Sequence, residues 1–173
     1  MRKRRAWLLA GVALAGWLAA AAGAETPAAE PSLERFLAAR GWSVVQLREN
    51  EFNQLEAEVL VNGVHRLRMQ ISTSFSKTII DEAVAKRLGL AIEPSGIEIT
   101  GAPKQRLGTL RLESLAFGET GLGAATVFTA DLPSLLHRSG SADAVQGVIG
   151  ADLLTKYQAV LEIPTTKLYL RAR

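Results

Sequence analysis

Side chains able to do covalent or metal chemistry are scarce in this chain. None of its 173 residues is a cysteine, which excludes disulfides, a thiolate nucleophile and thiolate metal ligands. The two histidines, His65 and His137, are far apart in the sequence, so we expect no imidazole-rich metal centre. The sequence Gly121-Leu122-Gly123 lacks the third glycine of a dinucleotide-binding loop, and no cofactor is expected. Hydroxyl and carboxylate groups are left as the candidates.

The hydroxyl groups concentrate in one short polar segment, Ser72-Thr73-Ser74-Phe75-Ser76. A serine nucleophile there would require a histidine base and an oxyanion hole, and neither histidine lies in a recognisable context for that chemistry. We favour instead a loop in which the Ser72 hydroxyl bonds neighbouring backbone groups. For Phe75, packing against the fold is slightly favoured over lining a groove.

The elements that would position this segment are predicted from periodicity. Residues 54–61 and 66–71 alternate apolar and polar side chains, and Asn62-Gly63 between them favours a tight hairpin turn. The polar segment follows as a loop. A helix over residues 81–88 is expected after it, because apolar residues recur there at helical spacing.

The C-terminal part of the chain is predicted to return to the same region. Residues 147–150 indicate a short buried strand, followed by a helix over residues 151–156. Asp152 then lies in the first turn of that helix, a position that suits a capping or first-turn carboxylate better than a catalytic one. A hairpin of residues 159–163 and 168–170 is expected to close the chain.

The remaining elements complete an all-β domain with two or three short helices. A short helix is expected at residues 32–40, and further strands or turns of helix at residues 42–47, 97–100, 105–110, 112–117, 124–129 and 132–137. The residues expected in the core are Leu55, Val59, Leu67, Met69, Ile71, Ile79, Val84, Leu88, Val148, Ile149, Leu153, Val160 and Leu168.

Residues 1–24 are expected to form a secretory signal peptide. A basic stretch at residues 2–5, an apolar run at residues 6–22 and the small residues Ala22-Gly23-Ala24 have the order of such signals. An uncleaved membrane anchor is the alternative, although the run is alanine-rich and slightly short for a span. We therefore expect a periplasmic or secreted protein with no stable membrane anchor after cleavage.

The mature chain would begin near Glu25, with a leader and short helix over residues 25–41 and a single domain over residues 42–173. Of the 20 basic residues, four lie in the signal peptide, which leaves 16 against 17 acidic residues. The basic character of the whole chain thus disappears on cleavage. A nucleic-acid partner is not expected, because such proteins need a basic face on the mature domain.

The order of these segments resembles that of the retropepsin-like aspartic proteases in their bacterial exported form. The resemblance covers roughly residues 55–170. It rests on the hairpin with Asn-Gly, the polar loop, Arg-Leu-Gly-Leu at residues 87–90 and Gly-Val-Ile-Gly-Ala-Asp-Leu-Leu at residues 147–154. It implies a single retropepsin-like domain of the closed β-barrel type, in a family where two subunits each supply one catalytic aspartate.

The polar loop departs from the family at the position that does the chemistry. The family loop reads Asp-Thr-Gly-Ala-Ser, so Thr73 and Ser76 fit, while Ser72 stands in place of the catalytic aspartate. Ser74 and Phe75 replace the glycine and the alanine. The family mechanism needs two carboxylates that share one proton, and a serine hydroxyl without a base does not replace them. The resemblance therefore implies a degenerate catalytic loop with no catalytic residue.

The resemblance also implies where a peptide groove would lie. It places a flap after residue 100, although these residues are nearly as compatible with a plain loop. It also places the short buried strand beneath the polar loop. Ser72 should then lie within roughly 10 Å of that strand, since packed segments touch. The candidate groove and flap residues are Gly101, Ala102, Pro103, Lys104, Gly147, Val148, Ile149 and Gly150.

Three functions are compatible with these observations. The favoured one is a catalytically inactive retropepsin-like domain that binds a peptide or a partner protein, with a homodimer as one possible assembly. A second is an endopeptidase subunit that is active only beside a relative supplying the aspartate. A third is a purely structural envelope protein. The sequence leaves the partner, the peptide preference and the oligomeric state open.

Overall fold

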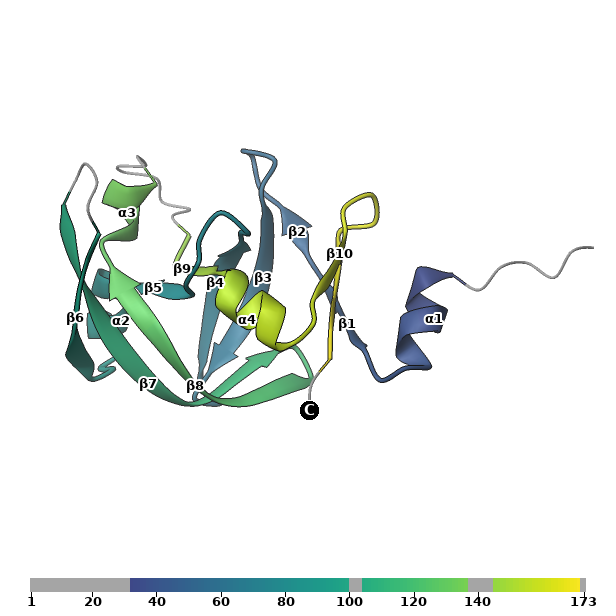
Figure 1. The fold of residues 1–173 in the computed structure, drawn as a ribbon, viewed down its shortest axis with the longest axis horizontal. Coiled ribbons are helices and arrows are strands. Elements are labelled where there is room, and N and C mark those ends of the chain that lie inside the picture. The colour runs from purple at the N-terminus through teal and green to yellow at the C-terminus, as the bar shows by residue number, and fades with distance from the viewer. Residues whose placement is uncertain (1–31, 100–103, 137–144, 172–173) are drawn as a thin grey trace, which may run out of the picture. The chain divides into compact units, whose positions relative to one another are not determined.

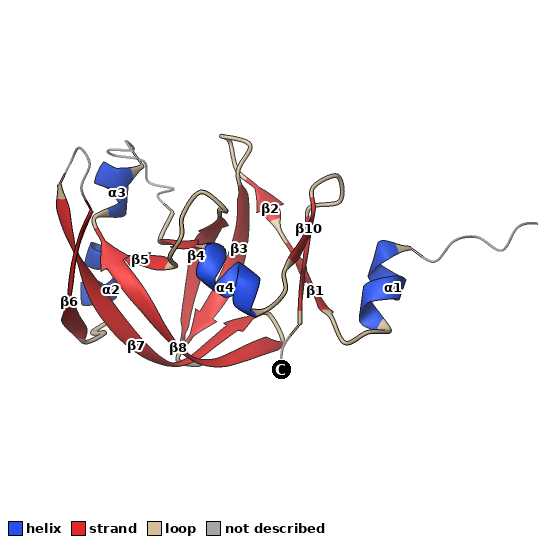
Figure 2. Cartoon of the chain, in the orientation of Figure 1, coloured by secondary structure: helices blue, strands red, loops and turns tan. Residues whose placement is uncertain are grey.

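The computed structural model describes residues 32–99, 104–136 and 145–171, and its fold is mainly β with short helices, as the sequence predicts (Figure 1). The helices are α1 (Leu33–Ala38), α2 (Glu82–Arg87), α3 (Leu132–Leu135) and α4 (Ala151–Lys156). The strands are β1 (Ser43–Gln46), β2 (Arg48–Glu49), β3 (Leu55–Val61), β4 (His65–Ile71), β5 (Ile79–Asp81), β6 (Ile92–Ile99), β7 (Gln105–Phe117), β8 (Thr120–Ala130), β9 (Gly147–Ile149), β10 (Val160–Glu162) and β11 (Lys167–Leu170). Figure 2 shows how strands dominate the chain.

The signal peptide expected at residues 1–24 lies outside the described residues. Within the described ranges, no helix combines the length and the apolar character that a membrane crossing requires. Among the described residues of the domain 42–173, for which two or three short helices were expected, the structure has α2, α3 and α4.

The larger sheet has the order β2-β3-β4-β9-β5-β8-β7-β6, and β3 pairs additionally with β7. Its unusual feature is β9, which lies between two strands that are consecutive in the chain. β9 runs parallel to β4 and antiparallel to β5. Because β4 and β5 are not neighbours, residues 72–78 must cross the end of β9 to connect them. The sheet order therefore places the polar segment directly beside the short buried strand.

The predicted hairpin is confirmed by β3 and β4. Asn62 and Gly63 adopt φ angles of 51° and 70°, the positive values that a tight hairpin turn of this kind requires. The alternating apolar side chains Val59, Leu67 and Met69 are buried, and the register pairs Val59 with Leu67. The period of two in the sequence thus marks the face that packs on the core.

The sequence did not predict the short strands β2 and β5, and it divided β7 into two segments. β2 and β5 are only two and three residues long, too short to show alternation. β5 is buried throughout, because it lies in the middle of the sheet between β9 and β8. β7 runs over residues 105–117, where a strand at residues 105–110 and a β-rich continuation over residues 112–117 were expected.

The core lies between the larger sheet and the elements that cover it. The predicted core residues are buried, except that Leu55, Leu88 and Val160 are only half-buried. Tyr169 and Phe117, which the sequence did not single out, are among the largest fully buried side chains.

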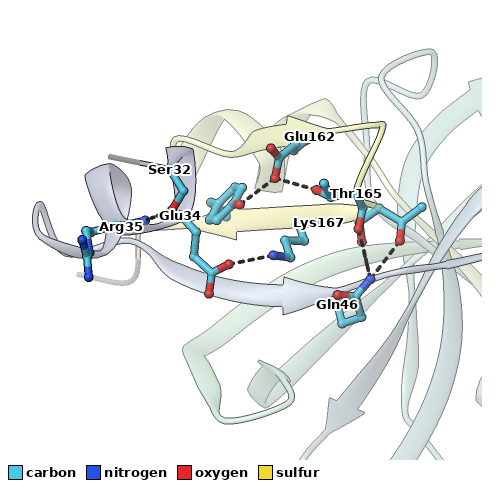
Figure 3. Close-up of polar contacts among 9 residues, drawn as sticks. Ser32, Glu34, Arg35, Gln46, Glu162, Thr165 and Lys167 are labelled. Atoms are coloured by element: carbon cyan, nitrogen blue, oxygen red, sulfur yellow. Dashed lines mark hydrogen bonds and ion pairs between the residues drawn. The ribbon is translucent and has the colours of Figure 1, made fainter. Parts of the chain in front are cut away.

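A smaller sheet of order β1-β11-β10 joins the ends of the described chain (Figure 3). The Tyr169 hydroxyl donates a hydrogen bond of 2.7 Å to Glu162, which also accepts one of 2.6 Å from Thr165. The Lys167 ammonium lies 2.6 Å from the Glu34 carboxylate and so ties α1 to β11. Burial, followed by the bond to Glu162, raises the pKa of Tyr169 to about 12.

Tyr169 should make the stability of the fold fall at alkaline pH. In an unfolded chain a tyrosine loses its proton near about pH 10, whereas the folded protein holds the Tyr169 proton to about 12. The contribution is therefore fully present below about pH 10 and is lost as the pH rises toward about 12. Urea unfolding across this range should show a steeper decline for wild type than for Tyr169→Phe, and equal slopes would contradict the assignment.

Candidate functional site

The polar loop and the short buried strand are in direct contact. The backbone N–H of Ser72 donates to the carbonyl of Ile149 at 3.0 Å, and the N–H of Ala151 donates to the carbonyl of Phe75 at 2.8 Å. The loop is thus bonded to the chain on both sides of Gly150. The expectation that Ser72 lies close to residues 147–150 is confirmed.

Gly150 is the residue over which the loop passes. A Cβ atom built there would lie 2.4 Å from both the carbonyl carbon and the oxygen of Lys77, and 2.9 Å from the carbonyl oxygen of Phe75. These contacts are with backbone, which has no flexible end to move aside. Glycine is therefore required at this position by the closeness of the loop.

A buried clamp holds the far end of the loop to α4. The Thr78 hydroxyl donates to Asp152 Oδ1 at 2.8 Å and accepts from the Gly150 N–H at 3.0 Å. The Thr78 N–H donates to Asp152 Oδ2 at 3.1 Å, and the Leu153 N–H reaches Oδ1 at 2.8 Å. Asp152 is thus a first-turn carboxylate, as predicted. The sequence did not identify Thr78 as its partner.

Removing the Thr78 hydroxyl should loosen this clamp. In Thr78→Val the shape is kept, but the buried Gly150 N–H loses its acceptor, and Asp152 Oδ1 keeps only the bond from the Leu153 N–H. An unpaired buried polar group costs about 1–3 kcal/mol, so the free energy of unfolding should fall by about that amount in urea titrations. Thr73→Val, at an exposed position of the same loop, is the matched control and should change it by less than about 0.5 kcal/mol.

The Ser72 hydroxyl has a structural partner and no base. It accepts a bond of 3.3 Å from the Ser74 N–H, the backbone bonding that the sequence indicated. Among the described residues, no carboxylate or imidazole forms a hydrogen bond with Ser72. The two nearby aspartates serve the fold, because Asp152 belongs to the clamp and Asp81 accepts from the N–H groups of Val84 and Leu132. Within the described residues, the hydroxyl of Ser72 therefore has a backbone partner and no hydrogen-bonded base.

An apolar surface adjoins the loop. Phe75 packs, half-buried, against a cluster of buried residues that includes Val148 of β9 and Ile79 of β5. The packing that was slightly favoured for Phe75 is thus what the structure has. Other half-buried apolar residues meet the same cluster, and with Phe75 they form what we call the loop-side apolar surface: Ile99, Phe128, Leu135 and Leu136.

Of the predicted groove and flap residues, only those of residues 147–150 lie next to the loop among the described residues. Gly147, Val148, Ile149 and Gly150 lie beneath it and are buried. Lys104 is exposed, and its ammonium lies 3.3 Å from the Glu98 carboxylate of β6. Gly101, Ala102 and Pro103 lie outside the described residues, so the flap stays a prediction.

Comparison with known proteins gives structural similarity alone. No protein-family model matches the sequence, and no curated protein matches it. The structure is similar to a retropepsin-like aspartic protease from Rickettsia conorii, with 16% identity, a TM-score of 0.49 and coverage of 75% of this chain and 90% of that one. It is also similar to the retroviral protease-like domain of Ddi1 from Leishmania major, with 15% identity, a TM-score of 0.46 and coverage of 68% of this chain and 87% of that one. A third similar structure is EIAV protease complexed with the inhibitor HBY-793, with 16% identity, a TM-score of 0.48 and coverage of 66% of this chain and 98% of that one.

These similarities, at low identity and with TM-scores below 0.5, do not decide what the chain does. Whether the chain is active has to be inferred from its own residues. In the described part of the chain, the most informative features are Ser72, which forms no hydrogen bond with a carboxylate or imidazole, and the loop-side apolar surface.

Proposed function

We propose that this chain is a catalytically inactive, exported retropepsin-like domain that binds an extended peptide segment over the loop Ser72–Ser76. The observation that carries the proposal is the Ser72 hydroxyl, which stands at the crossing of the loop over β9 and accepts a bond from the Ser74 N–H. Aspartic protease chemistry requires a pair of carboxylates sharing one proton. A pair of such subunits would bring together two hydroxyls and no proton acceptor.

Binding without catalysis is supported by the surroundings of the loop. The loop-side apolar surface offers side chains that are only half-buried, and apolar side chains of a partner would complete their burial. The loop itself is held rigidly by the Thr78–Asp152 clamp and by the bonds on both sides of Gly150. A pre-organised surface of this kind loses little entropy on binding.

The assembly and the compartment remain part of the proposal. A second copy of the chain could face the loop, as the resemblance implies. Export rests on the signal-like residues 1–24. The partner is a peptide or protein segment with apolar side chains, since apolar residues make up the surface that it would meet.

A statin-type peptide with apolar side chains is the probe for this site. Titrated into the full-length, nitrogen-15-labelled chain, it should shift the amide resonances of Ser74, Phe75 and Ala151, and it should be recovered uncleaved. Phe75→Ser should weaken binding by about fivefold, because about 1 kcal/mol of apolar burial is lost. Phe52→Ser is the control, because this side chain is 53% exposed and lies outside the loop-side apolar surface. It should leave the affinity for the peptide unchanged.

The proposal fails if the amides of the loop are unmoved at saturating peptide. It fails also if the two phenylalanine variants bind equally well, because Phe75 would then contribute nothing to the surface.

A further inference from the structure

One edge of the smaller sheet carries backbone groups that no described strand uses. β1 pairs with β11 alone. The Leu47 N–H donates to the Thr166 carbonyl at 2.8 Å, and the register continues from Gln46 opposite Lys167. Because bonded residues alternate along an antiparallel pair, Ser43 and Val45 bond to β11, and the backbone groups of Val44 and Gln46 face the free edge.

This free edge lines a groove rather than an open surface. Two adjoining cavities of about 620 Å³ and about 580 Å³ lie beside β1 and share Gln46 and Glu58. Residues Ser43–Gln46 form one wall of the larger cavity, and Glu58 with the turn between β7 and β8 forms the other.

The groove follows from the way the chain changes sheets. β1 continues through the buried Leu47 into β2, which pairs with β3 at Arg48 opposite Glu56. Further along β3, from Val59, the partner is β7. The chain before β2 therefore cannot stay paired with β3, because β7 occupies that side of β3, and it forms β1 in the smaller sheet instead. A wedge opens between β1 and the β7–β8 turn as a result.

The charges in the groove differ between its ends. Glu58 and Arg66 form an ion pair, and Arg68 lies 3.3 Å from Glu56, so these groups are neutralised within the fold. Within the described part of the chain, Arg48 and Glu119 take part in no ion pair. Arg48 lines the cavity beyond Gln46, and Glu119 lines the cavity along Ser43–Gln46. One cavity of the groove thus offers a free cation and the other a free anion.

We propose that the free edge of β1 binds an extended peptide, which adds as a further strand and carries an acidic side chain at the Arg48 end and a basic one at the Glu119 end. A strand added at about 4.7–4.9 Å from β1 would satisfy the backbone groups of Val44 and Gln46. A single extended segment suits the groove better than the edge of a second folded copy, because the β7–β8 turn and Glu58 stand opposite β1. This site is separate from the loop over β9.

Two acetylated and amidated probes, Glu-Val-Thr-Val-Lys and Lys-Val-Thr-Val-Glu, cover both strand directions. With the full-length, nitrogen-15-labelled chain, at least one should shift the amide resonances of Val44 and Gln46 and slow their hydrogen exchange. The Val45 amide, already bonded to β11, should keep its exchange rate. The same peptide methylated on alternate backbone nitrogens should not bind, since it keeps the side chains and loses the donors.

Two variants separate backbone pairing from charge. Val44→Pro removes an outward N–H without touching the β11 ladder and should abolish the shift at Gln46. Arg48→Glu should weaken binding by at least about twofold, since exposed ion pairs contribute modestly. The proposal is overturned by unmoved Val44 and Gln46 amides with both probes, by equal binding of the methylated peptide, or by shifts confined to Ser74 and Phe75. It is also overturned by concentration-dependent shifts of the chain alone, which would assign the edge to a second copy.

Discussion

Gly150→Ala should lower the free energy of unfolding by about 3 kcal/mol or more, at the upper end of what overpacking costs. The added methyl would meet the Lys77 carbonyl at 2.4 Å, and the loop could relieve the contact only by giving up its bonds to Ile149 and Ala151. Chemical denaturation monitored by circular dichroism measures the loss. The matched control is Gly121→Ala, where a Cβ has nothing within 4 Å, and the change should stay within about 0.5 kcal/mol.

A small effect of Gly150→Ala would mean that the loop does not lie on this glycine. The crossing of residues 72–78 over β9 would then be misplaced. Should the variant fail to fold, proteolysis of the wild type is the second measurement, and cleavage within residues 72–77 should be as slow as in the core strands.

Ile149→Ala should cost about 2–5 kcal/mol, the usual range for removing a large aliphatic side chain from a core. Ile149 is 1% exposed, and it belongs to the main core cluster beneath the sheet. Its strand has buried neighbours on both sides, β4 and β5, which leaves little room for collapse into the cavity. A clear drop in melting temperature is therefore expected.

Ile163→Ala is the control for this substitution, because the same side chain is 66% exposed there. It should change the free energy of unfolding by less than about 0.5 kcal/mol. Similar melting curves for the two variants would place Ile149 at the surface and refute the register of β9.

The parts of the fold that sequence reasoning could predict are those with local signals. The β3–β4 hairpin has alternation over both strands and Asn62-Gly63 at its turn, so the two strands and the turn followed from the pattern. The closing hairpin of β10 and β11 was bounded correctly within a residue or two for similar reasons. β5 has no such signal, because three buried residues show no period and their role depends on neighbours far away in the sequence.

The site divides in the same way. The contact of Ser72 with Ile149 came only from the resemblance to a family, because the insertion of β9 between β4 and β5 is a long-range event. The pairing of Thr78 with Asp152 joins residues 74 positions apart and was not predicted, although Asp152 was recognised as a first-turn carboxylate. The groove beside β1 was also missed, since it arises where one strand leaves a sheet.

Catalytic silence is the central claim, and a cleavage assay tests it most directly. The full-length wild type is incubated with an unfolded protein substrate from about pH 3 to about pH 7, which includes the acidic values at which carboxylate pairs of this kind share a proton. New N-termini are then counted by mass spectrometry, with and without a pepstatin-type inhibitor. We predict no inhibitor-sensitive cleavage, and the same result for Ser72→Ala. Cleavage by the wild type that the inhibitor blocks would contradict the claim.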